Sequence, residues 1–326
     1  MQISIVITTF NRVDDLNECL NSILNQTLLP IETIVIDNGI NNITESIIER
    51  RMDEFKKKDI VLVYIKNTEN SLTVARNIGS RNSSGEVILF LDDDVILDRD
   101  YIREIERLYR KFPQALGAQG YILREKRSKL KNMFNKIFFL FHLEKDKCKF
   151  LHSVSATYPF PLSRIMNCQW LSGSNFSFKR SVFETISFDE KLKKYSEGED
   201  LDFSYRLFKK FPNSLYISPD AKLIHNASPA GRLPDAELIY MREFYGLYLF
   251  FKNSEQNINN VFIYSWSRVG KIISNMVNLI SKLSFGEAKE SLILINAYLK
   301  CIVHFNELRH GDLEFFNKTI TSNCQL

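Results

Sequence analysis

The sequence has no uninterrupted apolar stretch of about 20 residues, the length that a membrane-spanning helix needs. Two long helical segments near the C-terminus come closest, but Arg268 and Lys271 interrupt the first and Lys300 interrupts the second. Interfacial helices that lie on a bilayer fit this pattern, and so does packing against the rest of the chain. The chain enters an apolar run at Ile3 without a basic leader, so we expect no secretory signal.

Cysteines are few, and the net charge is small. The 326 residues include five cysteines without paired spacing, which we expect to be free thiols in a reducing compartment: Cys19, Cys148, Cys168, Cys301 and Cys324. The 43 basic residues exceed the 39 acidic ones by only four, too little to indicate nucleic acid, and no nucleic-acid partner is expected. Hydrophobic residues at 44% are typical of a folded protein with one large core and an appendage, or two modest domains.

Basic residues concentrate between positions 124 and 149. A solvated helix face accounts for such a run, and binding to acidic lipid head groups is the alternative. The run consists of Arg124, Lys126, Arg127, Lys129, Lys131, Lys136, Lys145, Lys147 and Lys149.

The first 120 residues alternate short apolar runs with stretches of helical period, which predicts an open α/β fold with a mostly parallel sheet flanked by helices. A second block has a strand at 170–178, a helix at 199–211 and a strand that ends at Ile224. Residues 124–165 are expected to form a mobile or membrane-facing insertion, and 235–326 a helical C-terminal appendage. The predicted elements of the first block are strands at 3–9, 33–37, 60–65 and 87–91, and helices at 13–24, 47–55, 71–79 and 102–112.

Three consecutive aspartates, Asp92, Asp93 and Asp94, follow the apolar run 87–91. Alternation along a strand sends Asp92 and Asp94 to one face, roughly 6 to 7 Å apart, and Asp93 to the other. At an effective dielectric of about 20 the outer pair repels by roughly 3 kcal/mol, which a bridging divalent cation would reverse. The alternative is a solvated turn after a strand.

Polar residues also follow the other predicted strands: Thr8 and Thr9 end the first, and Asp37 and Asn38 end the second. Ligands of open α/β sheets bind outside the carboxyl ends of the strands, so these groups point to one crevice. No Gly-x-Gly-x-x-Gly turn follows the first strand, which excludes a nucleotide-binding dehydrogenase.

Six segments together resemble the family 2 glycosyltransferases, which have the GT-A fold and use nucleotide-diphosphate sugars. The resemblance covers residues 1–230 and implies a nucleotide-sugar half at 1–120 and an acceptor half at 166–230. The segments are Ser4 to Arg12 (SIVITTFNR), Ile34 to Gly39 (IVIDNG), Ala75 to Gly79 (ARNIG), Phe90 to Asp94 (FLDDD), Leu171 to Phe178 (LSGSNFSF) and Gly198 to Arg206 (GEDLDFSYR).

The resemblance implies a donor site, in which Asp92 and Asp93 contact the nucleotide sugar. Asp92 and Asp94 match the DxD element that holds Mn²⁺ or Mg²⁺. His225 is either a further metal ligand or structural. Arg76 would contact the diphosphate or base, although a surface arginine is the alternative. The nucleoside would lie against Thr8, Thr9, Phe10, Asn11, Arg12, Asp37 and Asn38.

The residues assigned to the nucleoside have one alternative role and one departure from the family's pattern. Thr8 and Thr9 could instead cap the following helix, which Asp14 and Asp15 would also favour. The hydroxyls and the flat ring of this segment suit uracil or thymine, so UDP or dTDP is favoured. Asn38 stands where a second carboxylate often reads the base, and this departure leaves the base open.

Glu199 and Asp200 match the family's ED element, in which the aspartate removes the proton of the acceptor hydroxyl. They could instead be first-turn acids that stabilise a helix N-terminus. Gly173, Ser174 and Asn175 would line the acceptor side with Glu199. Trp170 would either stack on a sugar ring or belong to the core.

The implied reaction is a single in-line displacement with inversion, without a covalent intermediate. The QxxRW element of processive synthases is absent, which favours transfer of one sugar per encounter. The expected acceptor is a glycan or a lipid-linked sugar, and the expected location is the cytoplasm, peripheral on the inner face of the cell membrane. A non-catalytic nucleotide-sugar or carbohydrate binding protein and a membrane-tethering scaffold remain the alternatives.

Overall fold

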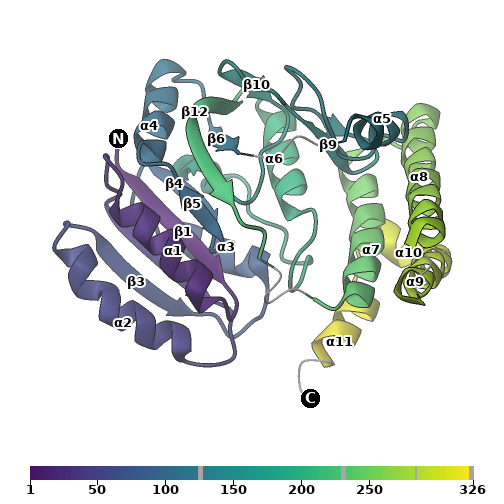
Figure 1. Cartoon of the computed structure of the whole chain (residues 1–326), viewed down its shortest axis with the longest axis horizontal. Coiled ribbons are helices and arrows are strands. Elements are labelled where there is room, and N and C mark those ends of the chain that lie inside the picture. The colour runs from purple at the N-terminus through teal and green to yellow at the C-terminus, as the bar shows by residue number, and fades with distance from the viewer. Residues whose placement is uncertain (124–127, 229–232, 283–284, 323–326) are drawn as a thin grey trace.

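The computed structural model describes residues 1–123, 128–228, 233–282 and 285–322. Nine of the described strands form one twisted sheet in the order β10-β12-β6-β11-β4-β1-β2-β3, with β5 paired to β12 (Figure 1). The strands are β1 (Ile3–Thr9), β2 (Glu32–Asp37), β3 (Val61–Lys66), β4 (Val87–Asp92), β5 (Val95–Leu97), β6 (Gly117–Ile122), β10 (Met166–Cys168), β11 (Phe176–Lys179) and β12 (Leu215–His225).

The sheet is parallel on its N-terminal side and mixed beyond it. Strands β3, β2, β1 and β4 run parallel, β11 lies antiparallel between β4 and β6, and β12 is parallel to β6. The predicted α/β class is therefore confirmed. The strand expected at 170–178 is wrong in its first half, since only Phe176–Lys179 is extended and residues 172–174 turn toward the site.

Five helices cover the two faces of the sheet: α1 (Val13–Leu24), α2 (Ile43–Lys56), α3 (Leu72–Asn82), α4 (Tyr101–Lys111) and α6 (Glu199–Lys210). Strand alternation sends Ile5 and Ile7 of β1 into one core with α1, α2 and α4. Val6 faces the other core, with α3 and α6. Each fully buried aliphatic side chain stabilises the fold by about 1.5–3 kcal/mol, so both layers are held to the sheet by their apolar faces.

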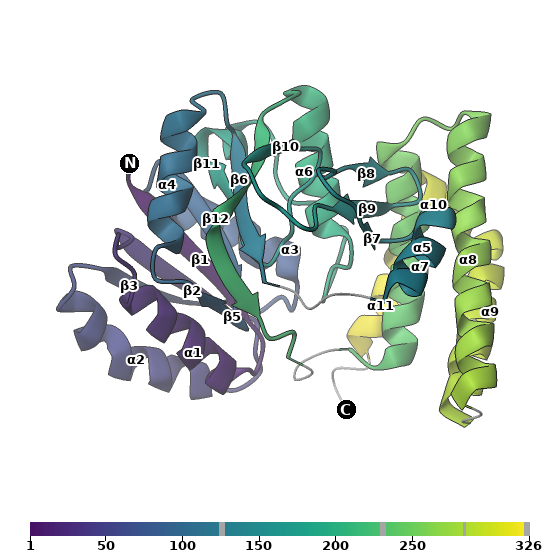
Figure 2. The ribbon, with the colours of Figure 1, turned by 45° about the horizontal axis from the view of Figure 1, so that its top comes forward.

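The insertion contains α5 (Lys129–Ile137) and a small sheet of β7 (His142–Leu143), β8 (Phe150–Leu151) and β9 (Ser155–Tyr158). Trp266 of α8 (Ile258–Lys282) stacks on Phe138 at the end of α5, with ring centroids 5.1 Å apart, and donates its indole N–H to the carbonyl of Ile137. Figure 2 shows α5 beside α8. The insertion is thus packed against the C-terminal helices. Arg124, Lys126, Arg127 and Cys324 lie outside the described residues.

The C-terminal region is helical, as expected, with α7 (Asp235–Asn253), α8 (Ile258–Lys282), α9 (Phe285–Val303), α10 (Phe305–His310) and α11 (Glu314–Ser322). Helix α7 lies next to α6: Lys252 Nζ is 3.0 Å from Asp202 Oδ2, and Asn253 donates to Asp202 Oδ1 at 2.9 Å. Among the described residues, each helix is too short or too polar to cross a bilayer. The four described cysteines are buried free thiols.

Candidate active site

A cavity of about 480 Å³ lies at the carboxyl ends of β1 and β4. The residues around it come from both halves of the sheet and from the start of α6 and α7. Those predicted from the sequence and found in its lining are Thr8, Thr9, Phe10, Arg12, Asn38, Arg76, Asp92, Asp93, Asp94, Gly173, Ser174, Glu199, Asp200 and His225.

The prediction that Asp93 faces away from the outer two aspartates is wrong, because Asp93 and Asp94 lie in the turn after β4 and Arg12 contacts both of them. Asp93 is buried, accepts a hydrogen bond of 2.7 Å from the Thr9 hydroxyl and lies 3.1 Å from Arg12 Nη1. Burial raises the pKa of Asp93 to about 7, although Arg12 opposes the shift. A solvated turn does not describe the triplet, because Asp93 and Asp94 are both buried.

The outer pair converges with a histidine from another strand. Strand β12 runs antiparallel to β5 with His225 opposite Val95, so the imidazole arrives beside the acidic turn. Its Nε2 lies 3.0 Å from Asp94 Oδ1 and 3.9 Å from Asp92 Oδ2. Burial raises the pKa of Asp94, but the hydrogen bond and charge of His225 outweigh it and hold that pKa below its usual value.

Asp92, Asp94 and His225 offer ligand atoms that all lie within 4.8 Å of one another. Two carboxylates and an imidazole form a donor set that suits a divalent cation such as Mn²⁺. A divalent ion between the carboxylates would also remove their mutual repulsion. The residues present therefore fit the cation that the sequence predicts.

Arg76 connects the aspartate triplet to the start of α6. Its guanidinium is 2% exposed, lies 3.3 Å from Asp92 Oδ1, donates to the Gly173 carbonyl at 3.0 Å and forms an ion pair with Glu199. It also lies 4.7 Å above the Phe176 ring. Burial raises the pKa of Glu199 to about 8, although Arg76 opposes the shift. Arg76 is thus a buried side chain between two carboxylates, which excludes the surface-arginine alternative.

Asp200 lies at the first turn of α6, where two backbone N–H groups hold its carboxylate. Gly173 N–H donates to Oδ2 at 3.0 Å and Leu201 N–H to Oδ1 at 2.7 Å. Burial raises the pKa of Asp200, and these hydrogen bonds oppose the shift. A Cβ at 173 would lie 2.9 Å from Glu199 Oε1, so glycine there leaves the Arg76–Glu199 ion pair undisturbed. Gly198 precedes the helix at φ +89°, a left-handed conformation that glycine adopts freely.

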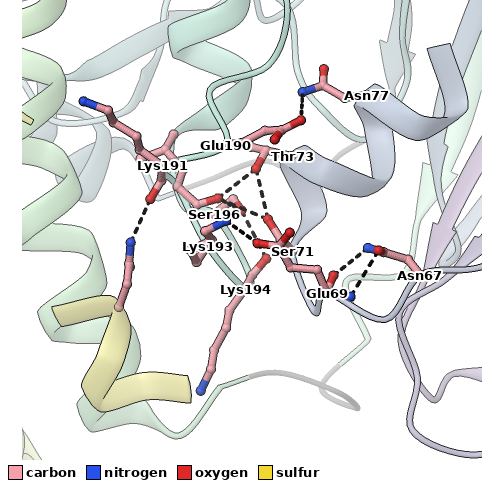
Figure 3. Close-up of polar contacts among 12 residues, drawn as sticks. Asn67, Glu69, Ser71, Thr73, Asn77, Glu190, Lys191, Lys193, Lys194 and Ser196 are labelled. Atoms are coloured by element: carbon pink, nitrogen blue, oxygen red, sulfur yellow. Dashed lines mark hydrogen bonds and ion pairs between the residues drawn. The ribbon is translucent and has the colours of Figure 1, made fainter. Parts of the chain in front are cut away.

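The loop that leads to Asp200 is held by α3 and by the residues just before it (Figure 3). Thr73 donates its hydroxyl to the Leu192 carbonyl at 2.8 Å, and Asn77 donates to Glu190 at 2.8 Å. The backbone of Lys194 exchanges hydrogen bonds with Asn70 and Leu72, at 3.1 and 2.9 Å. These contacts fix α3, which carries Arg76, against the loop that precedes Glu199.

The nucleoside end of the predicted site is less exposed than expected. Asp37 is fully buried and does not line the cavity, since it accepts hydrogen bonds from Gly39 N–H, Tyr64 and Lys66 at 2.8 to 2.9 Å. Asn38 does line it and accepts a hydrogen bond from Asn67 at 2.7 Å. Asn11 lies outside the lining with its backbone at φ +54°.

Two predicted acceptor residues belong to the surrounding packing. Asn175 is fully buried away from the cavity and donates to the Gly120 carbonyl at 3.1 Å. Trp170 is 5% exposed and donates its indole N–H to the Thr157 carbonyl at 2.9 Å, as a core tryptophan does. Trp170 nevertheless touches a second cavity, which is described below.

Lys194 and Glu237 line the cavity although neither was predicted. Lys194 Nζ lies 3.4 Å from Glu237 of α7, and the Lys194 backbone is left-handed at φ +53°. The sequence does not indicate that Lys194 lines the cavity, because a lysine rarely adopts the left-handed backbone conformation and nothing in its neighbours predicts it.

The fold and sequence match known glycosyltransferases. The chain is 23% identical over 234 residues to the glucosyl-dolichyl phosphate glucuronosyltransferase of Haloferax volcanii. The aligned residues cover 69% of each of the two chains. It is 33% identical over 110 residues to glycosyltransferase GlyA of Streptococcus pneumoniae, 34% of this chain and 15% of GlyA.

Two solved structures share the fold at low identity. TarS 1–349 of S. aureus matches with a TM-score of 0.55 and 13% identity, over 100% of this chain and 92% of that one. Mannosyltransferase PcManGT of Pyrobaculum calidifontis, solved with GDP-Man and Mn²⁺, matches with a TM-score of 0.56 and 14% identity. The match covers 92% of this chain and 87% of PcManGT. The fold is therefore GT-A, with a helical region at its C-terminus.

The model of the family described as Glycosyl transferase family 2 matches residues 4–186. That range includes Arg76, Asp92 and Asp94 but ends before Asp200 and His225. It covers more than half of the 326 residues, and the chain belongs to glycosyl transferase family 2.

Proposed function

We propose that this glycosyltransferase moves one sugar from a nucleotide-diphosphate sugar, with UDP or dTDP favoured, to a hydroxyl of a glycan or lipid-linked acceptor, with inversion. The observation that carries the proposal is one cavity lined by both a cation-binding set and the carboxylate of Asp200. Asp92, Asp94 and His225 would hold Mn²⁺ or Mg²⁺, which supplies positive charge to the leaving diphosphate. PcManGT, of similar fold, was solved with a nucleotide sugar and Mn²⁺.

The chain's own residues would divide the donor between them. Phe10, Thr8 and Asn38 offer a ring, a hydroxyl and an amide at the end assigned to the nucleoside. Arg76 presents a planar fork suited to phosphate oxygens. Arg12 fixes Asp93 and lies 3.4 Å from Asp94 Oδ2, so it orients the acidic turn.

Asp200 would take the proton of the attacking hydroxyl, because a sugar hydroxyl is a poor nucleophile at neutral pH. Its two backbone hydrogen bonds fix the orientation of the carboxylate. Its raised pKa makes it a stronger base than an ordinary aspartate. The hydroxyl would then displace the diphosphate in one step from the opposite face of the sugar.

The test combines donor binding with transfer. A thermal-shift screen of UDP-, dTDP- and GDP-sugars with and without Mn²⁺ identifies the donor, since a ligand at 100 times its Kd stabilises the native state by about 2.7 kcal/mol. Asp200→Asn should keep the donor shift and lose roughly 10²- to 10⁴-fold in transfer rate. Asp220→Asn, an exposed acid of β12, is the control. A donor shift that needs no metal, or full transfer by Asp200→Asn, contradicts the proposal; binding without any transfer by the wild type favours the non-catalytic alternative.

We also propose that the protein works in the cytoplasm, peripheral on the inner face of the cell membrane. The outer helices expose large apolar side chains, among them Phe262 at 56% and Ile280 at 72% on α8. Helix α5 exposes Leu130 and Met133 next to basic side chains. Apolar side chains with nearby lysines fit an interfacial helix on anionic lipid.

Point substitutions test this better than truncation, because removal of residues 235–326 would also remove the partners of Asp202 on α7. Phe262→Glu with Ile280→Glu should abolish flotation with anionic liposomes. Val61→Glu, at a residue 59% exposed on β3, is the matched control and should float like the wild type. Equal flotation of all three proteins, or none by the wild type, contradicts membrane association.

A further inference from the structure

A second cavity of about 520 Å³ lies behind Asp200, between the insertion and helices α7 and α8. It shares four lining residues with the donor cavity: Ser172, Glu197, Gly198 and Asp200. The carboxylate of Asp200 therefore borders both spaces. Figure 2 shows the small β7–β9 sheet and α5 beside α7 and α8, the elements that enclose this cavity.

Three cations from α7 and α8 line the second cavity: Arg242, Arg268 and Lys271. Glu243 is 2% exposed and pairs with two of them, at 2.7 Å to Arg268 Nη1 and 2.6 Å to Lys271 Nζ. One buried carboxylate thus faces two partly buried cations. Burial, and the neighbouring charge of Arg268, lower the pKa of Lys271 to about 8, as a local excess of positive charge does.

The acids of the cavity lie at its other end. Glu197 pairs with Arg242, whose Nε is 3.3 Å from its Oε1. Asp200 accepts from backbone N–H groups only, within the part of the chain that the structure describes. The cavity is therefore acidic where it meets the donor site and basic between α7 and α8.

Arg268 and Lys271, which are partly buried, keep donors for a ligand. Arg268 uses three of its five N–H groups, on Ser267 Oγ, Glu243 and the Ser153 carbonyl. Lys271 uses one of three, on Glu243. The others have no partner among residues 1–123, 128–228, 233–282 and 285–322. Gly246 lines the cavity beside Arg268, where a Cβ would lie at ordinary contact distance, 3.4 Å from Nη1, so that a larger side chain would enter this space.

We infer that this cavity binds the acceptor and that Arg268 and Lys271 recognise a phosphate group on it, while a nearby hydroxyl of the same molecule reaches Asp200. The inference rests on the proposed function and adds the chemical class of the acceptor. A planar guanidinium beside an ammonium suits the oxygens of a phosphate. Such a phosphate occurs either in a lipid-linked sugar or in a water-soluble sugar phosphate.

The test measures binding of glucose 1-phosphate by calorimetry with the donor cavity saturated by UDP and Mg²⁺, and glucose is the uncharged comparison. The wild type should bind glucose 1-phosphate at least about tenfold more tightly than glucose. Lys271→Gln should weaken binding of the phosphate about tenfold, and Glu243→Gln should strengthen it, because removal of a carboxylate increases the positive charge. Arg110→Gln, an exposed arginine of α4, should change nothing.

Gly246→Leu provides a variant that keeps every ion pair and fills the space beside Arg268, and it should abolish the phosphate preference. UDP affinity, measured in the same samples, shows that each variant is folded and tests the donor site separately. No preference for glucose 1-phosphate over glucose, or the same affinity in wild type, Lys271→Gln and Gly246→Leu, would overturn the inference even where UDP binds normally.

A second arm separates the two sources of phosphate. Vesicles of a neutral lipid that contain polyprenyl monophosphate are compared with vesicles of the same lipid that contain enough phosphatidylglycerol to give the same surface charge. If Lys271→Gln cosediments less than the wild type with the polyprenyl phosphate vesicles but equally well with the phosphatidylglycerol vesicles, the acceptor is lipid-linked. If glucose 1-phosphate binds but cosedimentation with the polyprenyl phosphate vesicles does not depend on Lys271, the acceptor is a water-soluble sugar phosphate.

Discussion

Acid should loosen the junction between α7 and α8 through one carboxylate, Glu243. Burial raises the pKa of Glu243, but Lys271 and Arg268 outweigh it and lower the pKa from 4.5 to about 2. A depressed pKa stabilises the fold above pH 4.5, and this contribution is lost as the pH falls from about 4.5 through about 2. The lowering of this pKa from 4.5 to about 2 corresponds to about 3 kcal/mol of folding free energy. Glu243 is buried, so solvent does not screen its interaction with the two cations.

Hydrogen exchange measured by mass spectrometry, corrected for the intrinsic rate at each pH, reports the opening of α7 and α8. Protection of these helices in the wild type should fall about a hundredfold between pH 6 and 2.5. Other acids titrate in the same range, so the matched variant is Glu243→Gln with Lys271→Met, which has the wild-type net charge without the titrating group. Its loss of protection should be much smaller. Equal losses in both proteins would refute the assignment to Glu243.

Three further outcomes follow from the site. His225→Gln should weaken Mn²⁺ binding, measured by calorimetry with UDP present, by at least about tenfold, and unchanged affinity would exclude His225 as a ligand. Because burial raises the pKa of Asp200 and the base must be deprotonated, kcat/KM should fall on the acid side at a pH above the usual aspartate value, and a rate that stays constant down to pH 4 would contradict this. Gly173→Ala should lower kcat more than donor affinity, because its Cβ would lie 2.9 Å from Glu199 and 3.0 Å from Arg76, an overpacking of about 1–3 kcal/mol; wild-type turnover would count against the role of the Arg76 bridge.

Much of the donor half could be predicted because its signals are local. A parallel strand buried on both faces is an unbroken apolar run, so β1 and β4 were predicted within a residue of their observed bounds. Acidic residues after such a run mark the carboxyl end of a strand, which located Asp92 and Asp94. The strand expected at 170–178 failed because Gly173 and Ser174 favour a turn, which outweighs the apolar residues around them.

The rest depends on contacts between distant segments. Helical periodicity indicates that residues 240–251 have apolar faces, but it does not reveal that Glu243 there meets Arg268 of the next helix. The Arg76–Glu199 bridge likewise joins two halves of the chain, and neither sequence segment encodes its partner. Asn175 and Trp170 were predicted as acceptor residues from their segment alone, while the structure uses their polar atoms to satisfy buried carbonyls.

Asp202 links the C-terminal helices to α6, the helix that begins with Glu199 and Asp200. It stands two residues after Asp200 in α6 and faces away from the cavity toward α7, where it meets Lys252 and Asn253 at 3.0 and 2.9 Å. Arg206 of α6 is 2.9 Å from the same carboxylate, so the buried charge is neutralised from both helices. Since removal of one partner leaves a buried charge uncompensated, a shift of α7 would destabilise the turn that carries Asp200. Helix α6, which begins with Asp200, is therefore fixed to α7, and α7 carries Glu243, the carboxylate that pairs with Arg268 and Lys271 of α8.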